Sequence, residues 1–373
     1  MPVRLRFDEE HALLRDEARR WLAERVTPAA LRRLAADARG DDPEWWAQLG
    51  ELGWTGLVVP EKCGGAGFGA VQLAVIAEET GRKLLPSPLL PTLLAAKLIE
   101  LAGSDAQREQ FLPRIAGGEA IATVAHVEPG GVWDARATTC TLSGARVCGE
   151  KAHVWAAPNA ALFVVPARDA GSRALRIAVV EEGAPGVRVE AESVLDPSRR
   201  QGRVRFQNAA CVPLAGDAAA AWSAWCAWAQ TALAAEMAGG ADAALAMTAA
   251  YAQTRVQFDR PIGAFQAIKH PLVNVLIATE QLRSLVFAAA SALDAGDAAA
   301  ALLARMAKAA ASEAYASACS RAVQFHGGYG FTEDCDAHLY LRRALASRPA
   351  LGDAREHRAA IARTLLDDGA ELP

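Results

Sequence analysis

The sequence predicts an α+β protein, mostly helical, with an N-terminal helical domain, a middle antiparallel β domain and a C-terminal four-helix-type bundle. Three observations predict this fold. Residues 1–120 carry apolar side chains at helical spacing, residues 121–213 hold short strand-like runs separated by turns, and residues 214–373 are long alanine-rich segments. A chain of 373 residues is long enough for the two or three domains that this pattern requires.

The N-terminal domain begins with an amphipathic helix. Leu14, Ala18 and Trp21 share one face of it, while Glu17 and Arg20 lie on another. Further helices are predicted over 45–52, 70–81 and 89–101. The glycine-rich run at 64–69 lacks the G-x-G-x-x-G spacing and the strand–helix alternation of a dinucleotide loop, so we expect an ordinary tight loop there.

The middle domain is predicted from short runs of β-branched and other apolar residues that show no helical period. The runs are 138–142, 145–148, 161–165, 176–180, 187–190 and 203–206. Turn signals such as Ser143-Gly144 and Pro185-Gly186 separate them. We therefore expect a small antiparallel barrel or sandwich.

The C-terminal domain is predicted to be a bundle of long helices joined by short loops. Its helices are expected at 218–256, 267–294 and 298–326, with a shorter one following. Residues 218–235 contain no charged side chain, which raises the question of a membrane span. The run is alanine-rich rather than leucine-rich and lies between Asp217 and Glu236, so we expect a buried helix and no membrane span.

Composition excludes several classes of function. The 39 basic and 43 acidic residues leave a net charge of -4 without a basic cluster, so nucleic acid is not expected as a partner. The seven cysteines show no C-x-x-C spacing, which indicates a reducing compartment rather than disulfides or zinc, and no metal site is predicted. The N-terminus carries acids where a signal peptide needs an apolar core, so the cytoplasm is the expected location.

Two segments of the C-terminal domain carry candidate chemistry. In 254–270, Arg255 follows a helix, where it could anchor a pyrophosphate or simply be a solvated residue favoured by the helix dipole. In 324–333, Gly327 and Gly328 could cap a helix or let a cofactor approach the backbone closely. The physical arguments alone leave both choices open.

The two segments resemble the signatures of the acyl-CoA dehydrogenase family. The run R-x-x-F-x-x-P-I-x-x-F-Q is present as Arg255, Phe258, Pro261, Ile262, Phe265 and Gln266. The run Q-x-x-G-G-x-G-[FY] is present as Gln324, Gly327, Gly328, Gly330 and Phe331. The similarity covers nearly the whole chain, and the order of helical, β and helical parts is that of the family.

The resemblance implies FAD as cofactor and an acyl-CoA thioester as substrate. It implies that Arg255, Phe258 and Gln266 reach the FAD of a neighbouring subunit, with the arginine on its pyrophosphate. Residues Gln324, Gly327 and Gly328 would contact the adenosine half of the same FAD. In the family a glutamate removes the α proton while the β hydrogen moves to the flavin, which gives a 2,3-enoyl-CoA, and an electron-transferring flavoprotein is a possible acceptor.

The sequence departs from the family where the catalytic base belongs. Counting from the second signature places Leu351 at the usual position of the base, and the other known position falls at about Ala229. Neither side chain can take a proton. Glu236 and Asp353 lie nearby and are weak candidates for the base, although a structural role is the expected one.

The segments that hold the flavin ring in the family are altered as well. The T-E-P-x-x-G-S-D loop corresponds to Val127–Asp134, and the W-I-T segment corresponds to His153, Val154 and Trp155. Valine and tryptophan cannot donate the hydrogen bonds that threonine makes there. The half-site for this chain's own flavin is therefore predicted to be disabled, whereas the half-site lent to a neighbour is predicted to be intact.

This asymmetry suggests the non-catalytic subunit of a bacterial heterotetrameric acyl-CoA dehydrogenase, paired with a homologous catalytic subunit. Two alternatives remain. One is a self-sufficient homo-oligomeric dehydrogenase with an atypical base. The other is a flavin-free structural or CoA-binding homologue.

Overall fold

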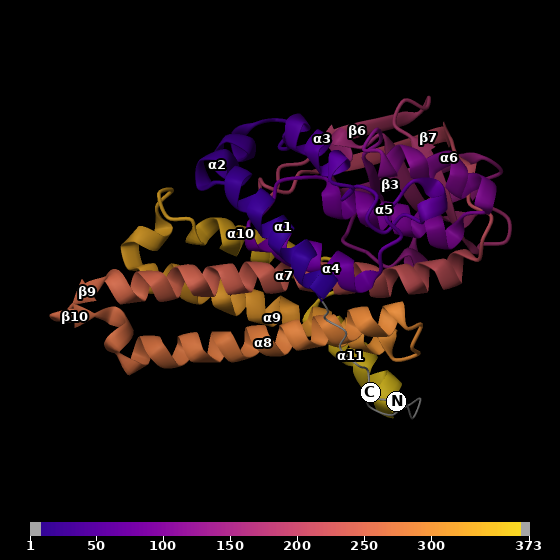
Figure 1. Ribbon diagram of the computed structural model, residues 1–373. Coiled ribbons are helices and arrows are strands. Elements are labelled where there is room, and N and C mark those ends of the chain that lie inside the picture. The colour runs from indigo at the N-terminus through magenta and orange to yellow at the C-terminus, as the bar shows by residue number, and fades with distance from the viewer. Residues whose placement is uncertain (1–8, 367–373) are drawn as a thin grey trace. The chain divides into compact units, whose positions relative to one another are not determined.

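The computed structural model describes residues 9–366 and shows helices, then strands, then helices in chain order (Figure 1). The first helices are α1 (Glu9–Arg25), α2 (Pro28–Ala36), α3 (Pro43–Glu51), α4 (Ala70–Arg82), α5 (Leu89–Ala102) and α6 (Asp105–Ala116). The last are α7 (Ala218–Thr254), α8 (Gln266–Asp294), α9 (Ala300–His326), α10 (Ala337–Ser347) and α11 (Ala354–Leu366). The predicted fold class, mostly helical α+β, is confirmed.

The strands between α6 and α7 form one curled sheet. They are β1 (Ala122–Val124), β2 (Thr141–Ser143), β3 (Arg146–Trp155), β4 (Leu162–Asp169), β5 (Leu175–Glu181), β6 (Val187–Ala191), β7 (Gln201–Ala210) and β8 (Val212–Pro213). Their order is β6-β7-β3-β2-β4-β5-β8, with β1 beside β4. Most pairs are antiparallel as predicted, but β1 and β2 each pair with β4 in parallel. Neither strand precedes β4 directly in the sequence, so the chain crosses over before pairing, and turn signals alone could not show this.

Contacts divide the chain into two compact units. Within the described residues, the bundle unit comprises 9–31, Ala70–Leu85 and 230–366, and the sheet unit comprises Arg32–Gly69 and Pro86–Ala229. Helix α7 begins in the sheet unit and continues into the bundle unit. The three-domain division at residues 120 and 213 therefore follows the type of element rather than compactness, and it stays a prediction.

In the sheet unit, the glycine-rich run at 64–69 folds back on the chain just before it. The amide of Gly67 donates to the carbonyl of Val59 at 2.8 Å. A Cβ placed on Gly65 would lie 2.2 Å from that same carbonyl oxygen, so only glycine fits there. The run is a tight loop, as the sequence predicted.

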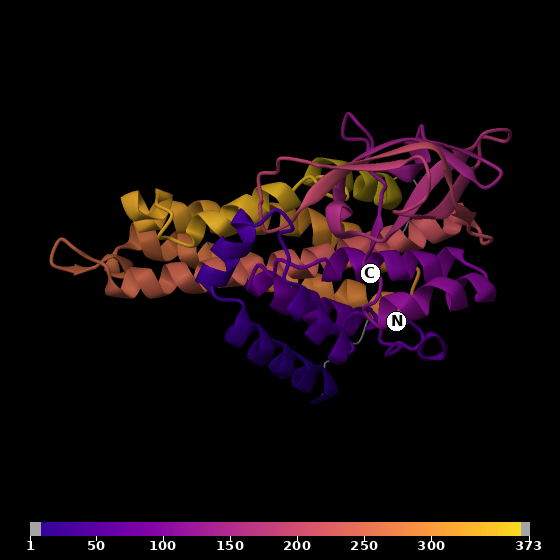
Figure 2. The ribbon, with the colours of Figure 1, turned by 90° about the horizontal axis from the view of Figure 1, so that it is seen from above.

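In the bundle unit, α7, α8 and α9 run side by side, with α10 and α11 against α9 (Figures 1 and 2). Helix α4 crosses α7 at two glycines. A Cβ on Gly239 would lie 1.8 Å from the carbonyl oxygen of Glu78, and one on Gly81 would lie 2.0 Å from that of Glu236. The two backbones therefore touch, which is the close approach expected of helices rich in small residues.

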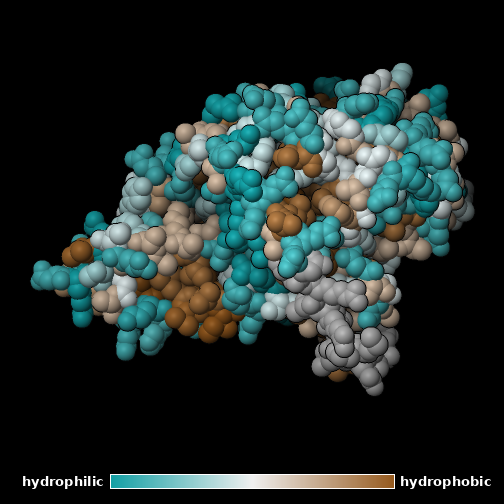
Figure 3. Space-filling view, viewed as in Figure 1, coloured by the Kyte–Doolittle hydropathy of each residue, from teal (hydrophilic) through white to brown (hydrophobic). Residues whose placement is uncertain are grey.

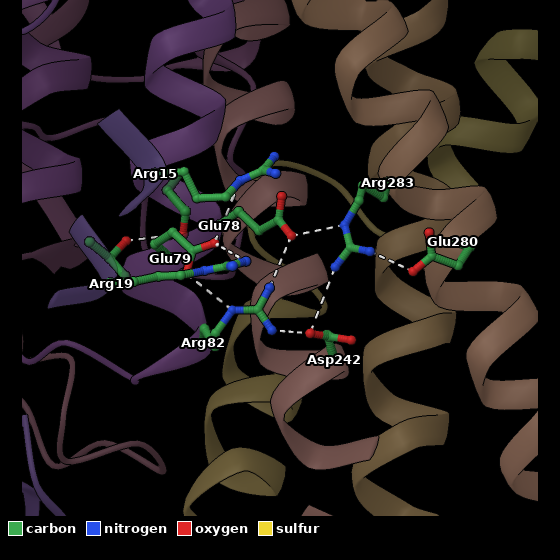
Figure 4. Close-up of polar contacts among 10 residues, drawn as sticks. Arg15, Arg19, Glu78, Glu79, Arg82, Asp242, Glu280 and Arg283 are labelled. Carbon is green, nitrogen blue, oxygen red and sulfur yellow. Dashed lines mark hydrogen bonds and ion pairs between the residues drawn. The ribbon is translucent and has the colours of Figure 1, made fainter. Parts of the chain in front are cut away.

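A network of ion pairs joins α4 to three other helices of the bundle unit (Figure 4). The side chains of Glu78 and Glu79 on α4 are only 4% and 1% exposed, respectively. Their pairs are Arg19–Glu79 at 3.0 Å, Arg82–Glu79 at 3.1 Å, Arg82–Glu78 at 3.2 Å and Arg283–Glu78 at 2.9 Å. Asp242 on α7 joins the network through Arg82 and Arg283. Both buried carboxylates are thus compensated, as burial of charge requires.

Helix α8 leaves an apolar face uncovered. Its Val273, Leu276 and Ile277 are 48%, 45% and 50% exposed, and hydrophobic atoms gather over this helix in Figure 3. We call these three residues the α8 patch. By length and composition alone, α8 is the one described helix that could cross a membrane, with 28% of its apolar window buried. The uncharged run at 218–235 in α7, which first raised that question, does not pass the same test within the described residues.

Candidate functional site

The first predicted segment forms an arm that projects beyond the ends of α7 and α8 (Figures 1 and 2). Strands β9 (Val256–Gln257) and β10 (Arg260–Pro261) pair antiparallel, and the turn between them consists of Phe258 and Asp259. Both turn residues have positive φ angles, 53° and 61°, which a two-residue hairpin favours but which side-chain-bearing residues rarely adopt. The arm is therefore a tight hairpin held at a local cost in backbone strain.

Aromatic and cationic side chains stack along the arm. The ring of Phe258 is 86% exposed and meets Phe265 edge to face at 6.0 Å. The guanidinium of Arg260 lies 4.3 Å from the centre of the Phe265 ring on that same arm. These contacts help to hold Phe258 in its solvent-facing position.

The predicted polar residues of the arm face solvent. Arg255 follows the last residue of α7, and Gln266 is the first residue of α8; both are exposed. Neither side chain has a hydrogen bond or ion pair to another residue within 9–366. An unpaired guanidinium fork and an unpaired amide on the same arm form a donor set that suits an anionic, hydrogen-bonding group such as a pyrophosphate.

The second predicted segment ends α9. Gly327 has φ +61° and its amide donates to the carbonyl of Gln324, so it does cap the helix. Above Gly327 and Gly328 a Cβ would meet nothing within 4 Å, whereas one on Gly330 would lie 2.5 Å from the carbonyl of Val323. The turn therefore ends the helix, as one interpretation of the sequence required. It also leaves open backbone, so the approach of a cofactor stays a prediction.

Three stacked rings bring the two segments together. Tyr251 near the end of α7 stacks on His326, the last residue of α9, at 4.3 Å and 24°. Tyr329 lies nearly parallel to Tyr251 at 6.2 Å, in the short 3-10 helix that follows His326. The arm and the glycine turn are therefore neighbours at one end of the bundle unit. Sequence reasoning missed this stack, because its only signal was a tyrosine beside the glycines.

The two weak candidates for the base have other partners. Glu236 is 5% exposed, and its Oε1 lies 3.1 Å from Nη1 of Arg343, which is 2% exposed. Asp353 accepts a hydrogen bond from the amide of Glu356 at 2.8 Å, while the Glu356 carboxylate accepts one from the Asp353 amide at 3.0 Å. This reciprocal pair caps the first turn of α11, and the hydrogen bond from the Glu356 amide lowers the pKa of Asp353. Both carboxylates are engaged in holding the bundle unit.

The loop at 348–353 contains Leu351, the position that the sequence predicts for the usual base. Leu351 is 2% exposed and has φ +58°, an unusual conformation for leucine. Buried Lys308 of α9 fixes the loop through hydrogen bonds from Nζ to the carbonyls of Arg348 and Gly352, both at 3.1 Å. Burial lowers the pKa of Lys308 to about 7, although the carboxylates of Asp353 and Glu356 oppose this shift. Hydrogen bonds therefore hold the loop, and the side chain of its Leu351 is apolar and buried.

In the loop at 127–134, two acidic side chains accept hydrogen bonds from other residues of the sheet unit. The Glu128 carboxylate accepts hydrogen bonds from Nζ of Lys151 at 2.8 Å, from Oγ1 of Thr139 at 2.6 Å and from the amide of Cys140 at 3.0 Å. Burial opposes ionisation, yet these donors and Thr138 hold the pKa of Glu128 well below its usual range. Asp134, at the end of the loop, accepts from the indole of Trp222 at 3.2 Å.

Two side chains of the segment at 153–155 also contact other residues of the sheet unit. Both the amide and the ring Nδ1 of His153 lie 3.0 Å from the Glu192 carboxylate. The guanidinium of Arg199 lies 4.6 Å from the centre of the Trp155 ring. Residues 153–155 thus offer no hydroxyl to a flavin ring, and a disabled flavin half-site in the sheet unit stays a prediction. The exposed donors of the arm and the open glycine turn suit an anionic dinucleotide.

The fold and the arm define the class of this protein, a flavin-dependent dehydrogenase built from helical, β and helical parts. Family comparisons agree. The sequence model described as acyl-CoA dehydrogenase, N-terminal domain, matches residues 8–119, and that described as acyl-CoA dehydrogenase, C-terminal domain, matches residues 222–366. The chain belongs to the acyl-CoA dehydrogenase family, which confirms the predicted enzyme class, an oxidoreductase acting on CH–CH bonds, and FAD as the cofactor.

Individual relatives extend over almost the whole chain. Acyl-CoA dehydrogenase IpdE2 of Mycobacterium tuberculosis is 34% identical, over 93% of this chain and 95% of its own length. A solved variant of the Tcur3481-Tcur3483 steroid ACAD is 32% identical, with a TM-score of 0.89 over 97% of this chain and 99% of that one. A chain of the ChsE4-ChsE5 complex from Mycobacterium tuberculosis is 27% identical, with a TM-score of 0.89 over 99% of this chain and 100% of that one.

Proposed function

We propose that this chain is the non-catalytic subunit of a heteromeric acyl-CoA dehydrogenase and completes the FAD site of a homologous catalytic subunit. One observation carries the proposal. The two positions predicted from the sequence for the base, at about residue 229 and at residue 351, hold the buried, apolar Ala229 and Leu351, while the donors of the arm are exposed and unpaired. This chain can therefore help to bind a cofactor but has no free carboxylate at either position.

In this proposal, the arm and the glycine turn each bind a different part of the cofactor. FAD, when bound, supplies the acceptor for the hydride that leaves the acyl chain. The Arg255 guanidinium binds the pyrophosphate, the Gln266 amide donates or accepts beside it, and the open backbone at Gly327 and Gly328 lets the nucleotide approach. The base and the donors that polarise the thioester belong to the catalytic subunit.

Two relatives support a heteromer and a substrate class. The solved steroid ACAD carries a double name, and the ChsE4-ChsE5 structure is described as a complex. By analogy, the substrate of the assembled enzyme is the CoA thioester of a steroid side chain or of another fatty acyl group. Its reduced flavin would pass electrons to an electron-transferring flavoprotein.

The test is to produce the full chain alone and together with a homologous dehydrogenase subunit from a neighbouring gene. We expect the chain alone to be colourless or poorly soluble, and the co-produced complex to show the visible absorbance of bound flavin and to oxidise an acyl-CoA. In that complex, Arg255→Gln should lower the flavin content, whereas Arg363→Gln, which removes an exposed arginine of α11, should not.

Each alternative has its own outcome. A yellow homo-oligomer that oxidises an acyl-CoA unaided, and that loses turnover but keeps flavin in Glu236→Gln or Asp353→Asn, would establish a self-sufficient enzyme. A complex that never holds flavin would establish a flavin-free homologue. Either result overturns the proposal.

A further inference from the structure

Three aromatic rings gather in the sheet unit near the beginning of α7. The indoles of Trp222 and Trp225 stack on each other at 4.6 Å and 27°. The ring of His126 lies 5.8 Å from the first indole and 5.5 Å from the second, edge on to the latter. Both indoles are 1% exposed. They belong to the uncharged run at 218–235, and the proposed function gives them no role.

Hydrogen bonds hold both indoles in place. Nε1 of Trp225 donates to the carbonyl of Leu94 on α5 at 2.8 Å, and Nε1 of Trp222 donates to the Asp134 carboxylate at 3.2 Å. Burial lowers the pKa of His126 to about 4, so its ring packs against the indoles as a neutral group. If an indole moved aside, its N–H would lose its acceptor in the interior of the unit, which costs free energy.

The two indoles lie on the face of α7 that contains Ala229. Residues 222, 225 and 229 share one face because residues three and four apart are neighbours on a helix. The sequence predicts one position of the base at about residue 229, and a base must lie within hydrogen-bond reach of the proton that it removes from the α carbon. An acyl chain bound to this chain would therefore lie beside this face of α7, where the structure places Trp222 and Trp225.

We propose that Trp222, Trp225 and His126 form an aromatic plug that fills the space of an acyl chain in this subunit, so that the substrate binds only to the catalytic subunit. This inference rests on the proposed function and adds to it the residues that exclude the substrate from this chain. Rings packed in contact leave no room for a chain of methylene groups unless they move, and the hydrogen bonds of the indoles oppose such a movement.

The experiment locates the acyl chain in the co-produced complex. A straight-chain acyl-CoA that carries a diazirine at the far end of its acyl group is added, the sample is irradiated, and labelled peptides are identified by mass spectrometry. We expect label on the catalytic subunit and none on α5 or α7 of this chain. An excess of the same acyl-CoA without the diazirine should abolish the label.

The double variant Trp222→Ala/Trp225→Ala removes most of the plug. In the complex with this variant, label should appear on α5 and α7 of this chain while the catalytic subunit stays labelled. Trp46→Ala is the matched control, because it removes a buried indole elsewhere in the sheet unit, one that donates to the carbonyl of Gly118 at 2.8 Å. It should leave the pattern of label unchanged.

Three results would overturn the inference while the proposed function stands. They are label on α5 or α7 of this chain in the unchanged complex, a double variant that assembles with flavin but gains no label, and an equal gain of label in Trp46→Ala. The unchanged complex tests the inference even if the double variant fails to fold. A complex that holds no flavin and is labelled on neither chain would instead contradict the proposed function itself.

Discussion

Glu236 shows how burial decides the role of a single carboxylate. Because Arg343 is buried with it, removal of one partner takes the opposite charge away from the other in the interior of the bundle unit. We predict that Glu236→Leu lowers the free energy of unfolding by about 3–5 kcal/mol, the range for breaking a buried pair. The double variant Glu236→Leu/Arg343→Met should recover much of that loss. Urea unfolding followed by circular dichroism measures both.

A catalytic role for Glu236 would give a different pattern. The single variant would then unfold at the same urea concentration as the unchanged protein while turnover disappeared. Restored stability in the double variant without any change in flavin content would confirm that the pair is structural.

Lys308 gives a second prediction at the scale of one residue. Its pKa is about 7 in the folded chain, because of burial, against an ordinary value of 10.5, so the unfolded chain binds the extra proton between these values. The contribution of Lys308 to stability is therefore greatest above pH 10.5 and falls as the pH falls toward 7, by at most about 1.4 kcal/mol per pH unit. Lys308→Met should remove this slope. Urea unfolding of both proteins across the interval between the two pKa values checks it, and parallel pH profiles would contradict it.

At the scale of elements, the sequence predicted the long helices well because their periodicity extends over many turns. The predicted range 267–294 differs from α8 by one residue at its start. Short elements escaped prediction: β1 and β8 have three and two residues, too few to show an alternation. Parallel pairing with β4 was also missed, because pairing between distant strands leaves no local pattern.

The crossing of α4 and α7 depends on glycine. Gly239→Ala would place a methyl group inside the backbone of α4, so the helices must separate, and we expect a loss of several kcal/mol or failure to fold. Gly328→Ala is the matched control, because its methyl group meets open space. It should unfold like the unchanged protein yet lower the flavin content of the complex. Thermal unfolding and the visible absorbance of flavin separate the two effects, and equal unfolding temperatures would refute the crossing argument.

For the whole molecule, the sequence offered candidates for the cofactor half-site but could not show how they lie together. Arg255 and Gly327 are candidates because each stands in a local signature that can be read along the chain, and their role toward the cofactor stays a prediction. The Tyr251–His326–Tyr329 stack joins residues that are far apart in the sequence, so only the folded chain reveals it. The hydrogen bonds that the Glu128 carboxylate accepts could not be predicted from the sequence either, because their donors lie in β3 and in the residues before β2.

The α8 patch provides the last prediction. Three large apolar side chains on one exposed helical face are costly in water, and a partner subunit that covers them would remove that cost. The same helix begins at Gln266 beside the arm, so association over α8 would bring the arm to a partner. Leu276→Asp should therefore dissociate the complex and release flavin, as measured by sedimentation velocity followed through both protein and flavin absorbance.

Leu13 on α1 is the matched control, because it is 71% exposed and lies on another helix. Leu13→Asp should leave both the assembly and its flavin unchanged. If Leu276→Asp kept the complex intact and yellow, the patch would not be the interface. If it dissociated the complex while flavin stayed with the catalytic subunit, the arm would not be needed to hold FAD. The two readouts thus test association and cofactor binding separately.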